Sequence, residues 1–287
     1  MRILLAVDGS DNSYEATRAL AYLTRPEQVT IVHALDVPTV PYPSMAPKAA
    51  EELSTAVEKQ LREEGERLLD RIVSLLPAGT GPVDRRMEIG TPADVIQTVA
   101  QQQGADLIVV GARGHGPIKE RLLGSVSHRV LSMSTCAKLI VNRLVSSIRR
   151  ILLALQGPDD AEAALRFLAM TPFREPVEVT IVTVVPFVPP LWPAGLSMTE
   201  GVKRTVLLSA QDFVENVSSR LTGPAYHAKG LAMLASPVHV ILNEASKVNP
   251  DVIMMGSRGR KGVTRLVLGS ISHAVLHQAG CPVLVFQ

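Results

Sequence analysis

Two short glycine patterns in this chain are suited to holding a phosphate group. Gly111-Ala-Arg-Gly114 is followed after nine residues by Gly124-Ser125, and Gly256-Ser-Arg-Gly259 is followed after nine residues by Gly269-Ser270. Each position of the second pattern lies 145 residues after its counterpart, and each pattern follows an apolar run. A strand that enters a glycine turn and then a helix directs backbone N–H groups toward phosphate oxygens. The repetition therefore predicts a shared nucleotide-binding fold in both halves of the chain.

Each residue of the first pattern has an expected physical role. Without a Cβ atom, Gly111 and Gly114 can adopt positive φ and let the main chain approach a phosphate closely, and Gly124 does the same at the helix entrance. Ser125 is expected to cap the helix and to donate its hydroxyl to a phosphate. The helix N-terminus adds about half a unit of positive charge, which favours an anion there. The second pattern repeats these roles at Gly256, Gly259, Gly269 and Ser270.

The arginines and histidines beside the glycine patterns give weaker evidence for phosphate binding than the glycines do. Arg113 and Arg258 lie inside the two turns, where each could touch a phosphate or simply face the solvent. His128 and His273 fall in the first turn of the following helix, where each could approach a γ-phosphate, although a solvent-facing or locally capping histidine is the expectation we favour.

Several sequence patterns of rapid phosphoryl transfer are missing. The chain has no Gly-x-x-x-x-Gly-Lys-[Ser/Thr] loop and no set of kinase motifs. No Cys/His cluster has zinc spacing, and no carboxylate pair is placed to hold two metal ions. We therefore predict binding without turnover, no catalytic residue, and no metal held by the protein alone. One Mg²⁺ that bridges bound phosphates, with few protein ligands, is compatible with the pattern.

The elements around the glycine patterns are duplicated as well. The strand-like run Arg2-Ile-Leu-Leu-Ala6 reappears as Arg150-Ile-Leu-Leu-Ala154, and Val29-Thr-Ile-Val32 reappears as Val179-Thr-Ile-Val182. The offset between copies changes only in the segments between elements, as insertions in loops would produce. We predict two homologous domains, 1–145 and 148–287, joined by a short polar stretch at 146–147.

Within each half, apolar runs rich in β-formers alternate with helical patterns. This alternation predicts an α/β fold with two tandem doubly wound domains, each with helices on both faces of a parallel sheet. Thr91-Pro92 and Ser236-Pro237 have the form of a helix N-cap followed by proline at the first helical position. In the first half, strands are expected at 2–7, 29–35, 83–88, 106–111 and 137–142. Long helices are expected near 48–76 and 198–221.

Composition limits the class of protein and its partners. With 46% hydrophobic and 20% charged residues over 287 positions, the chain is globular, and each half can build its own core. The net charge is +2 with mixed signs and without a basic stripe, which argues against nucleic acid as a partner. The uncharged stretch Pro186–Thr199 contains four prolines, and Asp8 interrupts the apolar start early. We expect no membrane segment, no signal peptide and a cytoplasmic location.

At these residues the chain resembles the universal stress protein family, in its tandem two-domain form and its ATP-binding branch. The resemblance covers essentially all 287 residues and rests on Asp8 after the first strand, on Gly90-Thr-Pro92, and on the duplicated glycine patterns. It implies a five-stranded parallel sheet of order 3-2-1-4-5 in each half, with ATP at the carboxyl edge. It also implies that domains pair through their last strands, here Lys138–Asn142 and Pro282–Phe286, within one chain or in a homodimer.

The resemblance also assigns roles to single residues. Ala6 and Asp8 lie at the end of the first strand, where Asp8 would hydrogen-bond the nucleoside, and Ala34 would meet the adenine. Val110 and Val126 would flank the phosphate loop. The matching positions of the second half are Ala154, Gln156, Val184, Met255 and Ile271.

One of these positions departs from the pattern. Gln156, an uncharged amide, stands where the first half has Asp8. Losing a charge-assisted hydrogen bond costs about 1.5–3 kcal/mol, or roughly ten- to a hundredfold in affinity. We therefore expect both halves to bind adenine nucleotide, the first more tightly.

Three functions remain open on the sequence alone. The first is an ATP-binding stress-response protein whose nucleotide state alters its contacts with a protein partner that the sequence does not identify. The second is a slow ATPase or nucleotide-transfer enzyme built on the same fold. The third is an interaction module without nucleotide. The sequence does not distinguish ATP from ADP or AMP as the preferred ligand.

Overall fold

A computed structural model of the chain describes residues 1–37, 47–114, 123–186, 199–257 and 268–287. The chain divides into two compact units. Unit 1 comprises Met1–Ala21 and Arg25–Leu144, and unit 2 comprises Tyr22–Thr24 and Val145–Gln287. The short segment Tyr22–Thr24 belongs to unit 2, where Leu23 forms an antiparallel bridge with Phe173. Among the described residues, no helix combines the length and the apolar character that a membrane crossing requires.

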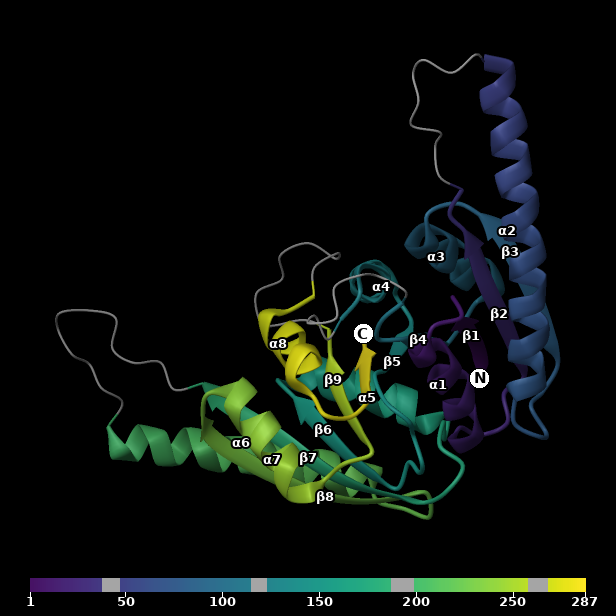
Figure 1. Cartoon of the computed structure of the whole chain (residues 1–287). Coiled ribbons are helices and arrows are strands. Elements are labelled where there is room, and N and C mark those ends of the chain that lie inside the picture. Colours follow the sequence, from purple (N-terminus) through teal and green to yellow (C-terminus); the bar gives the residue numbers. More distant parts are fainter. Residues whose placement is uncertain (38–46, 115–122, 187–198, 258–267) are drawn as a thin grey trace, which may run out of the picture. The chain divides into compact units, whose positions relative to one another are not determined.

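Unit 1 is a five-stranded parallel sheet with helices on both faces (Figure 1). Its strands are β1 (Arg2–Ala6), β2 (Gln28–Leu35), β3 (Val83–Ile89), β4 (Leu107–Gly111) and β5 (Ala137–Val141), and they lie in the order β3-β2-β1-β4-β5. Its helices are α1 (Asp11–Ala19), the short 3₁₀ turn η1 (Leu20–Tyr22) at its boundary, α2 (Pro47–Leu75), α3 (Pro92–Gln103) and α4 (Ser125–Met133). Helices α1 and α2 pack on one face, and α3 and α4 pack together on the other.

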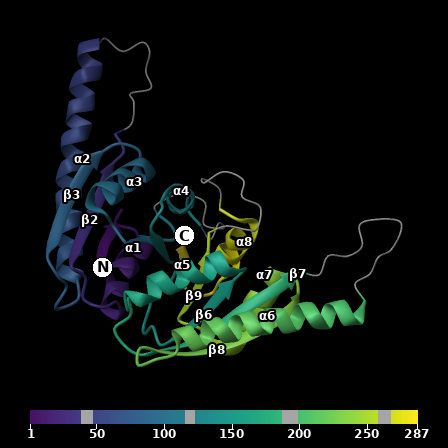
Figure 2. The same ribbon diagram turned by 180° about the vertical axis from the view of Figure 1, so that it is seen from behind.

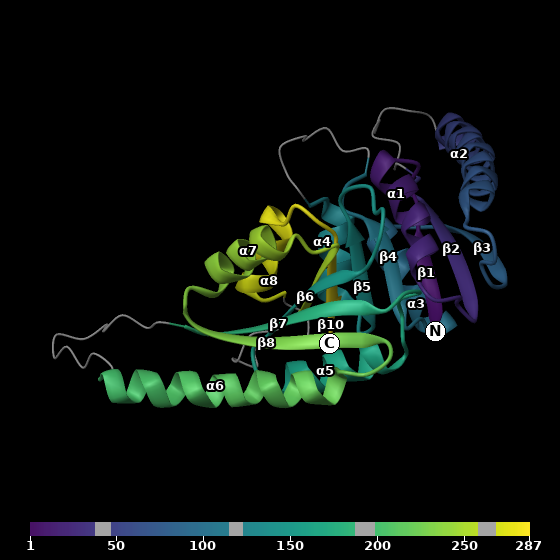
Figure 3. The same cartoon turned by 90° about the horizontal axis from the view of Figure 1, so that it is seen from below.

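Unit 2 repeats this arrangement. Its strands are β6 (Arg150–Leu155), β7 (Val177–Pro186), β8 (Tyr226–Ala235), β9 (Val252–Gly256) and β10 (Val283–Phe286), in the order β8-β7-β6-β9-β10. Its helices are α5 (Pro158–Ala169), α6 (Glu200–Leu221), α7 (Pro237–Val248) and α8 (Ser270–Gln278). Helix α6 runs along β7 and β8 (Figure 2), while α7 and α8 cover the opposite face (Figure 3).

The predicted fold class and strand order are therefore confirmed, and the strand sequences explain why each sheet is parallel and covered on both faces. All five residues of β4 and all five of β5 are buried, as expected for a parallel sheet covered on both faces. Thr91 and Ser236 are the N-caps of α3 and α7, and each is followed by proline, although neither side chain makes a capping hydrogen bond.

The long helices differ from the expectation in one respect. Apolar residues recur at helical spacing along the whole of α2, as a buried face would require, but only the carboxyl-terminal half of the helix enters the core. Leu69 and Ile72 are fully buried, whereas Leu53 near the start is 41% exposed. Helix α6 behaves in the same way, with Val217 buried and Val202 47% exposed. Helix α2, with 29 residues, is longer than β2 and β3 beneath it, so its first turns have no sheet to cover.

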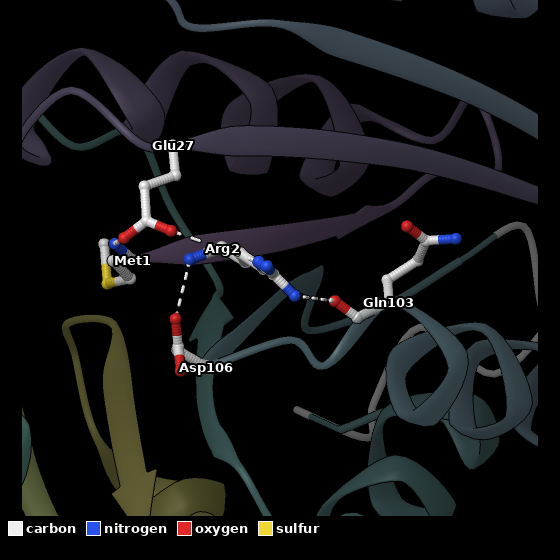
Figure 4. A network of polar contacts seen from close by, with 5 residues as sticks. All are labelled: Met1, Arg2, Glu27, Gln103 and Asp106. Carbon is white, nitrogen blue, oxygen red and sulfur yellow. Dashed lines mark hydrogen bonds and ion pairs between the residues drawn. The ribbon is translucent and has the colours of Figure 1, made fainter.

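The amino ends of the strands are held together by an acidic residue in each unit. In unit 1, the Asp106 carboxylate accepts a hydrogen bond from the backbone N–H of Arg2 at 2.7 Å (Figure 4). The Arg2 side chain donates to the Gln103 carbonyl at 3.3 Å, and the Met1 ammonium group pairs with Glu27 at 2.6 Å. In unit 2, Asp251 accepts from the backbone N–H groups of both Arg149 and Arg150. These acids stabilise the edge opposite the glycine patterns and belong to the fold.

Candidate functional site

The carboxyl edge of the unit 1 sheet brings together the ends of its three central strands. Ala6 is paired with Val32 of β2 on one side and with Val110 of β4 on the other. Ala34 lies two residues farther along β2, and Asp8 follows β1 directly. The residues expected to contact a nucleoside therefore lie at one edge, where ligands bind in open α/β sheets.

Asp8 and Ser10 connect the end of β1 to the first glycine turn. Asp8 Oδ1 accepts a hydrogen bond from the Ser10 N–H at 3.0 Å and lies 2.6 Å from Ser10 Oγ. Ser10 Oγ also lies 3.0 Å from the carbonyl oxygen of Arg113, so its proton can serve either acceptor. A Cβ atom on Gly114 would overlap Asp8 Oδ2. Glycine at position 114 therefore makes room for the Asp8 carboxylate.

Gly111 is required for a different close approach. A Cβ atom there would lie 2.8–2.9 Å from atoms of Asn12 and Ser13 at the start of α1. The carbonyl oxygen of Gly111 accepts a hydrogen bond from the buried Ser127 Oγ at 2.7 Å, which holds the first turn of α4 against the end of β4. A backbone bond of 2.7 Å from Gly124 N–H to the Ala112 carbonyl fixes the same junction.

Two of the expected local roles are wrong. The N-cap of α4 is Gly124, and Ser125 is the first helical residue and makes no capping bond. The expectation of positive φ at Gly111, Gly114 and Gly124 also fails, because the described glycines with positive φ lie elsewhere in the chain. Close packing is what requires glycine at 111 and 114. At Gly124 a Cβ atom would make only ordinary contacts from 3.4 Å outward.

In unit 2, one pocket lies at the matching edge of the sheet, with a volume of about 580 Å³ that includes the open space at its mouth. Eight of the ten residues predicted for the second half line it: Ala154, Gln156, Val184, Met255, Gly256, Gly269, Ser270 and Ile271. The other two, Arg258 and Gly259, lie outside the described residues. Further apolar side chains complete the wall, among them Val182 and Ile241. An open, mostly apolar pocket with a few polar groups in its wall is typical of sites for small molecules.

The junction of strand and helix is built in unit 2 as it is in unit 1. Ser272 Oγ donates to the Gly256 carbonyl at 2.8 Å, and the Gly269 N–H donates to the Ser257 carbonyl at 2.9 Å. The N-cap is again the glycine, Gly269, and the expected capping by Ser270 is wrong here too. The first turn of α8, with its unsatisfied N–H groups, therefore meets the pocket at Gly269 and Ser270.

The two units differ at the end of the first strand. In unit 1, the backbone N–H of Asp8 donates to Ser13 Oγ at 3.2 Å. In unit 2, the N–H of Gln156 donates to the carboxylate Oδ2 of Asp160 at 3.0 Å, and Asp160 lines the pocket. The second site therefore contains a carboxylate, although Gln156 replaces the acid of the first site.

Sequence reasoning missed the residues that hold the site together. Ser127 and Ser272 occupy matching places in the repeated Ser-x-Ser-His segments, so the duplication itself was the signal for their common role. Asp160 gave no such signal, because the matching residue of the first half is Asn12. Only the fold shows that its side chain reaches the end of β6.

Comparisons with known proteins agree with the duplicated architecture. The model of the universal stress protein family matches residues 1–142 and again residues 147–287. Universal stress protein Rv2623 of Mycobacterium tuberculosis is 26% identical over 296 residues, which cover 96% of this chain and 94% of that protein. Universal stress protein YxiE of Bacillus subtilis is 33% identical over 144 residues, which cover 49% of this chain and 97% of that protein.

A solved structure has the same fold. The crystal structure of a universal stress protein from Archaeoglobus fulgidus superposes with a TM-score of 0.69 at 20% identity, over 100% of this chain and 98% of that chain.

Proposed function

Because the chain belongs to the universal stress protein family, in its tandem two-domain form, we propose that it is a stress-response protein that binds one adenine nucleotide in each unit. The observation that carries the proposal is the pocket of unit 2. Residues from the ends of β6, β7 and β9 and from the start of α8 line one apolar cavity that opens at the N-terminus of a helix.

One end of this cavity suits the base of a nucleotide, and the other end suits its phosphates. The aliphatic wall, formed in part by Val184, Ile241 and Met255, can cover a flat purine base. The N–H groups at the start of α8 favour an anion, because they combine unsatisfied donors with the positive end of the helix dipole. Gly269 and Ser270 would hold the phosphates. A Mg²⁺ ion that bridges them would neutralise part of their charge.

In unit 1 the proposal rests on the same construction. Gly111, Gly124 and Ser127 repeat the contacts of Gly256, Gly269 and Ser272. Asp8 lies at the end of β1, within reach of a ligand that occupies the carboxyl edge, and its side chain is exposed there. We propose binding without rapid turnover, so that the nucleotide acts as a signal and is not a substrate.

Titration calorimetry with MgATP tests this function. We expect the whole chain to bind two equivalents, and we expect Gly114→Val and Gly259→Val each to bind one. A valine at 114 displaces the Asp8 carboxylate, which lies where its Cβ would be. Gly223→Val is the matched control, because no atom lies within 4 Å of the place of its Cβ, and it should still bind two equivalents.

Two results would contradict the proposal. One is the absence of any binding heat at millimolar ATP together with no nucleotide released when the purified protein is denatured. The other is steady phosphate release from ATP at a rate above one turnover per minute, abolished by the double valine variant, which would make the protein an enzyme.

A further inference from the structure

The pocket of unit 2 contains a carboxylate at a place where unit 1 has none. Asp160 lies four residues after Gln156, at the position that matches Asn12, and its side chain lines the pocket. The acid of the first site, Asp8, follows β1 directly, whereas the acid of the second site comes from the first turn of α5. The acids of the two sites that correspond in this way therefore come from different elements.

Two backbone contacts determine where the Asp160 carboxylate lies. Its Oδ2 accepts the N–H of Gln156 at 3.0 Å. The equivalent N–H in unit 1 is satisfied by Ser13 Oγ, but the residue that matches Ser13 is Ala161, which has no acceptor in its side chain. Asp160 thus takes over a structural hydrogen bond and adds a negative charge to the site.

The second contact is with the first glycine of the phosphate pattern. A Cβ atom on Gly256 would overlap Asp160 Oδ1 and would lie 2.8 Å from its Cγ. The carboxylate therefore lies against the backbone at the end of β9, between the ends of β6 and β9. This is the crevice where neighbouring crossovers leave the sheet in opposite directions and where ligands of doubly wound folds bind.

A carboxylate in this crevice restricts which part of a nucleotide can lie beside it. It repels phosphates, so the neighbouring group must be a hydrogen-bond donor. The donors of an adenosine nucleotide are the ribose hydroxyls and the amino group of adenine. Val182 and Val184, which are part of the apolar wall, come from β7, on the other side of β6 from Asp160, and we place the base against them. The ribose therefore lies nearest to the carboxylate.

We propose that Asp160 accepts hydrogen bonds from the ribose hydroxyls of the nucleotide in unit 2 and makes this pocket selective for ribonucleotides. Carboxylates recognise the ribose of dinucleotides in the same chemical way in other doubly wound folds. The inference rests on the proposed function, and it assigns the sugar-recognition role in unit 2 to α5 instead of to the end of the first strand.

The test compares MgATP with its 2′,3′-dideoxy analogue on the Gly114→Val chain, in which only the second pocket is open. We expect the dideoxy analogue to bind about ten- to a hundredfold more weakly, the effect of losing a hydrogen bond to a charged group. In Gly114→Val/Asp160→Asn the difference should shrink to about threefold or less. The asparagine keeps an acceptor oxygen for the Gln156 N–H, and an unchanged melting temperature without ligand would show that the fold is intact.

Asp159→Asn in the same background is the matched control. It removes the same charge from the neighbouring residue of the same helical turn, but Asp159 is exposed and does not line the pocket. This variant should discriminate between ATP and the dideoxy analogue as strongly as its parent does. If Asp159→Asn and Asp160→Asn reduce the discrimination between ATP and the dideoxy analogue equally, general electrostatics governs the selectivity, and the proposed contact from Asp160 is wrong.

Other outcomes separate this inference from the proposed function. If the Gly114→Val chain binds ATP and the dideoxy analogue equally well, the inference is overturned while nucleotide binding stands. If the Gly114→Val chain binds the inosine nucleotide more weakly than ATP but binds the dideoxy analogue as well as ATP, the carboxylate contacts the base, and its assignment to the ribose is wrong. If it binds no nucleotide although the unmodified chain binds one equivalent, both the inference and the proposed function of unit 2 fail.

Discussion

At the scale of single residues, the glycines of the phosphate pattern are required for different reasons. Gly111 must be glycine because backbone atoms of Asn12 and Ser13 occupy the space of a side chain. Gly124 has ordinary clearance, and its place at the helix N-cap suits a small polar residue equally well. The spacing of glycines in the sequence does not reveal this difference, because the neighbours come from elsewhere in the chain.

A pair of substitutions separates the two cases. Gly111→Ala should lower the free energy of unfolding by about 1–3 kcal/mol, because the added methyl group overpacks the junction between β4 and α1. Gly124→Ser should change it by less than about 0.5 kcal/mol, because its Cβ meets nothing closer than 3.4 Å and its hydroxyl can cap α4. Calorimetric melting of the chain without nucleotide measures both, and equal destabilisation would contradict the packing argument.

At the scale of elements, each unit uses a glycine to bring its long helix close to the sheet. In unit 1 the glycine is on the helix: a Cβ on Gly65 of α2 would lie 2.6 Å from Met87 Sδ and 3.0 Å from His33 Cδ2. In unit 2 it is on the strand: a Cβ on Gly230 of β8 would lie 2.7–2.9 Å from side-chain and backbone atoms of Val214. The close packing of the long helix on the sheet therefore depends on a helix glycine in unit 1 and on a strand glycine in unit 2.

The two solutions should respond differently to alanine. Gly230→Ala should cost about 1–3 kcal/mol, because the backbone carbon of Val214 cannot move without displacing α6. Gly65→Ala should cost less than about 1 kcal/mol, because the flexible Met87 side chain can turn away and alanine favours the helix by about 1 kcal/mol over glycine. Denaturant unfolding of both variants compares them, and a larger loss for Gly65→Ala would refute this reasoning.

At the scale of the whole molecule, duplication has kept the scaffold and changed the site. Both units retain the strand order, the glycine N-cap and the serine that binds the first glycine carbonyl. They differ in the acid, which follows the first strand in unit 1 and lies on the first helix in unit 2. The carboxyl edges of the two sheets can therefore differ in the ligands that they prefer.

The pairing of the last strands is a prediction that belongs to this scale. If Lys138–Asn142 and Pro282–Phe286 pair within one chain, neither last strand is left to pair with a second copy, and the protein should be a monomer at micromolar concentration. Sedimentation equilibrium with and without MgATP measures the mass. A stable dimer in both conditions would favour pairing between two chains.

Much of the fold was predictable because its signals are local and repeated. Continuous apolar runs such as Leu107–Val110 are typical of parallel strands covered on both faces, and the structure has β4 there. The long helix predicted near 48–76 is α2, Pro47–Leu75. Its apolar stripe did not reveal that Leu53 stays exposed, since burial depends on how far the sheet extends beneath the helix.

The sequence by itself determined the number of units, the α/β class and the position of the glycine patterns, because each rests on periodicity, repetition or a short motif. The strand order was expected only from the family resemblance. Only the tertiary structure decided which glycines are packed against backbone, which serines hold the helices, and that Asp160 supplies a carboxylate to the second pocket. These are contacts between segments that meet at the ends of different elements. Their partners are set by packing geometry, which no local pattern of residues encodes.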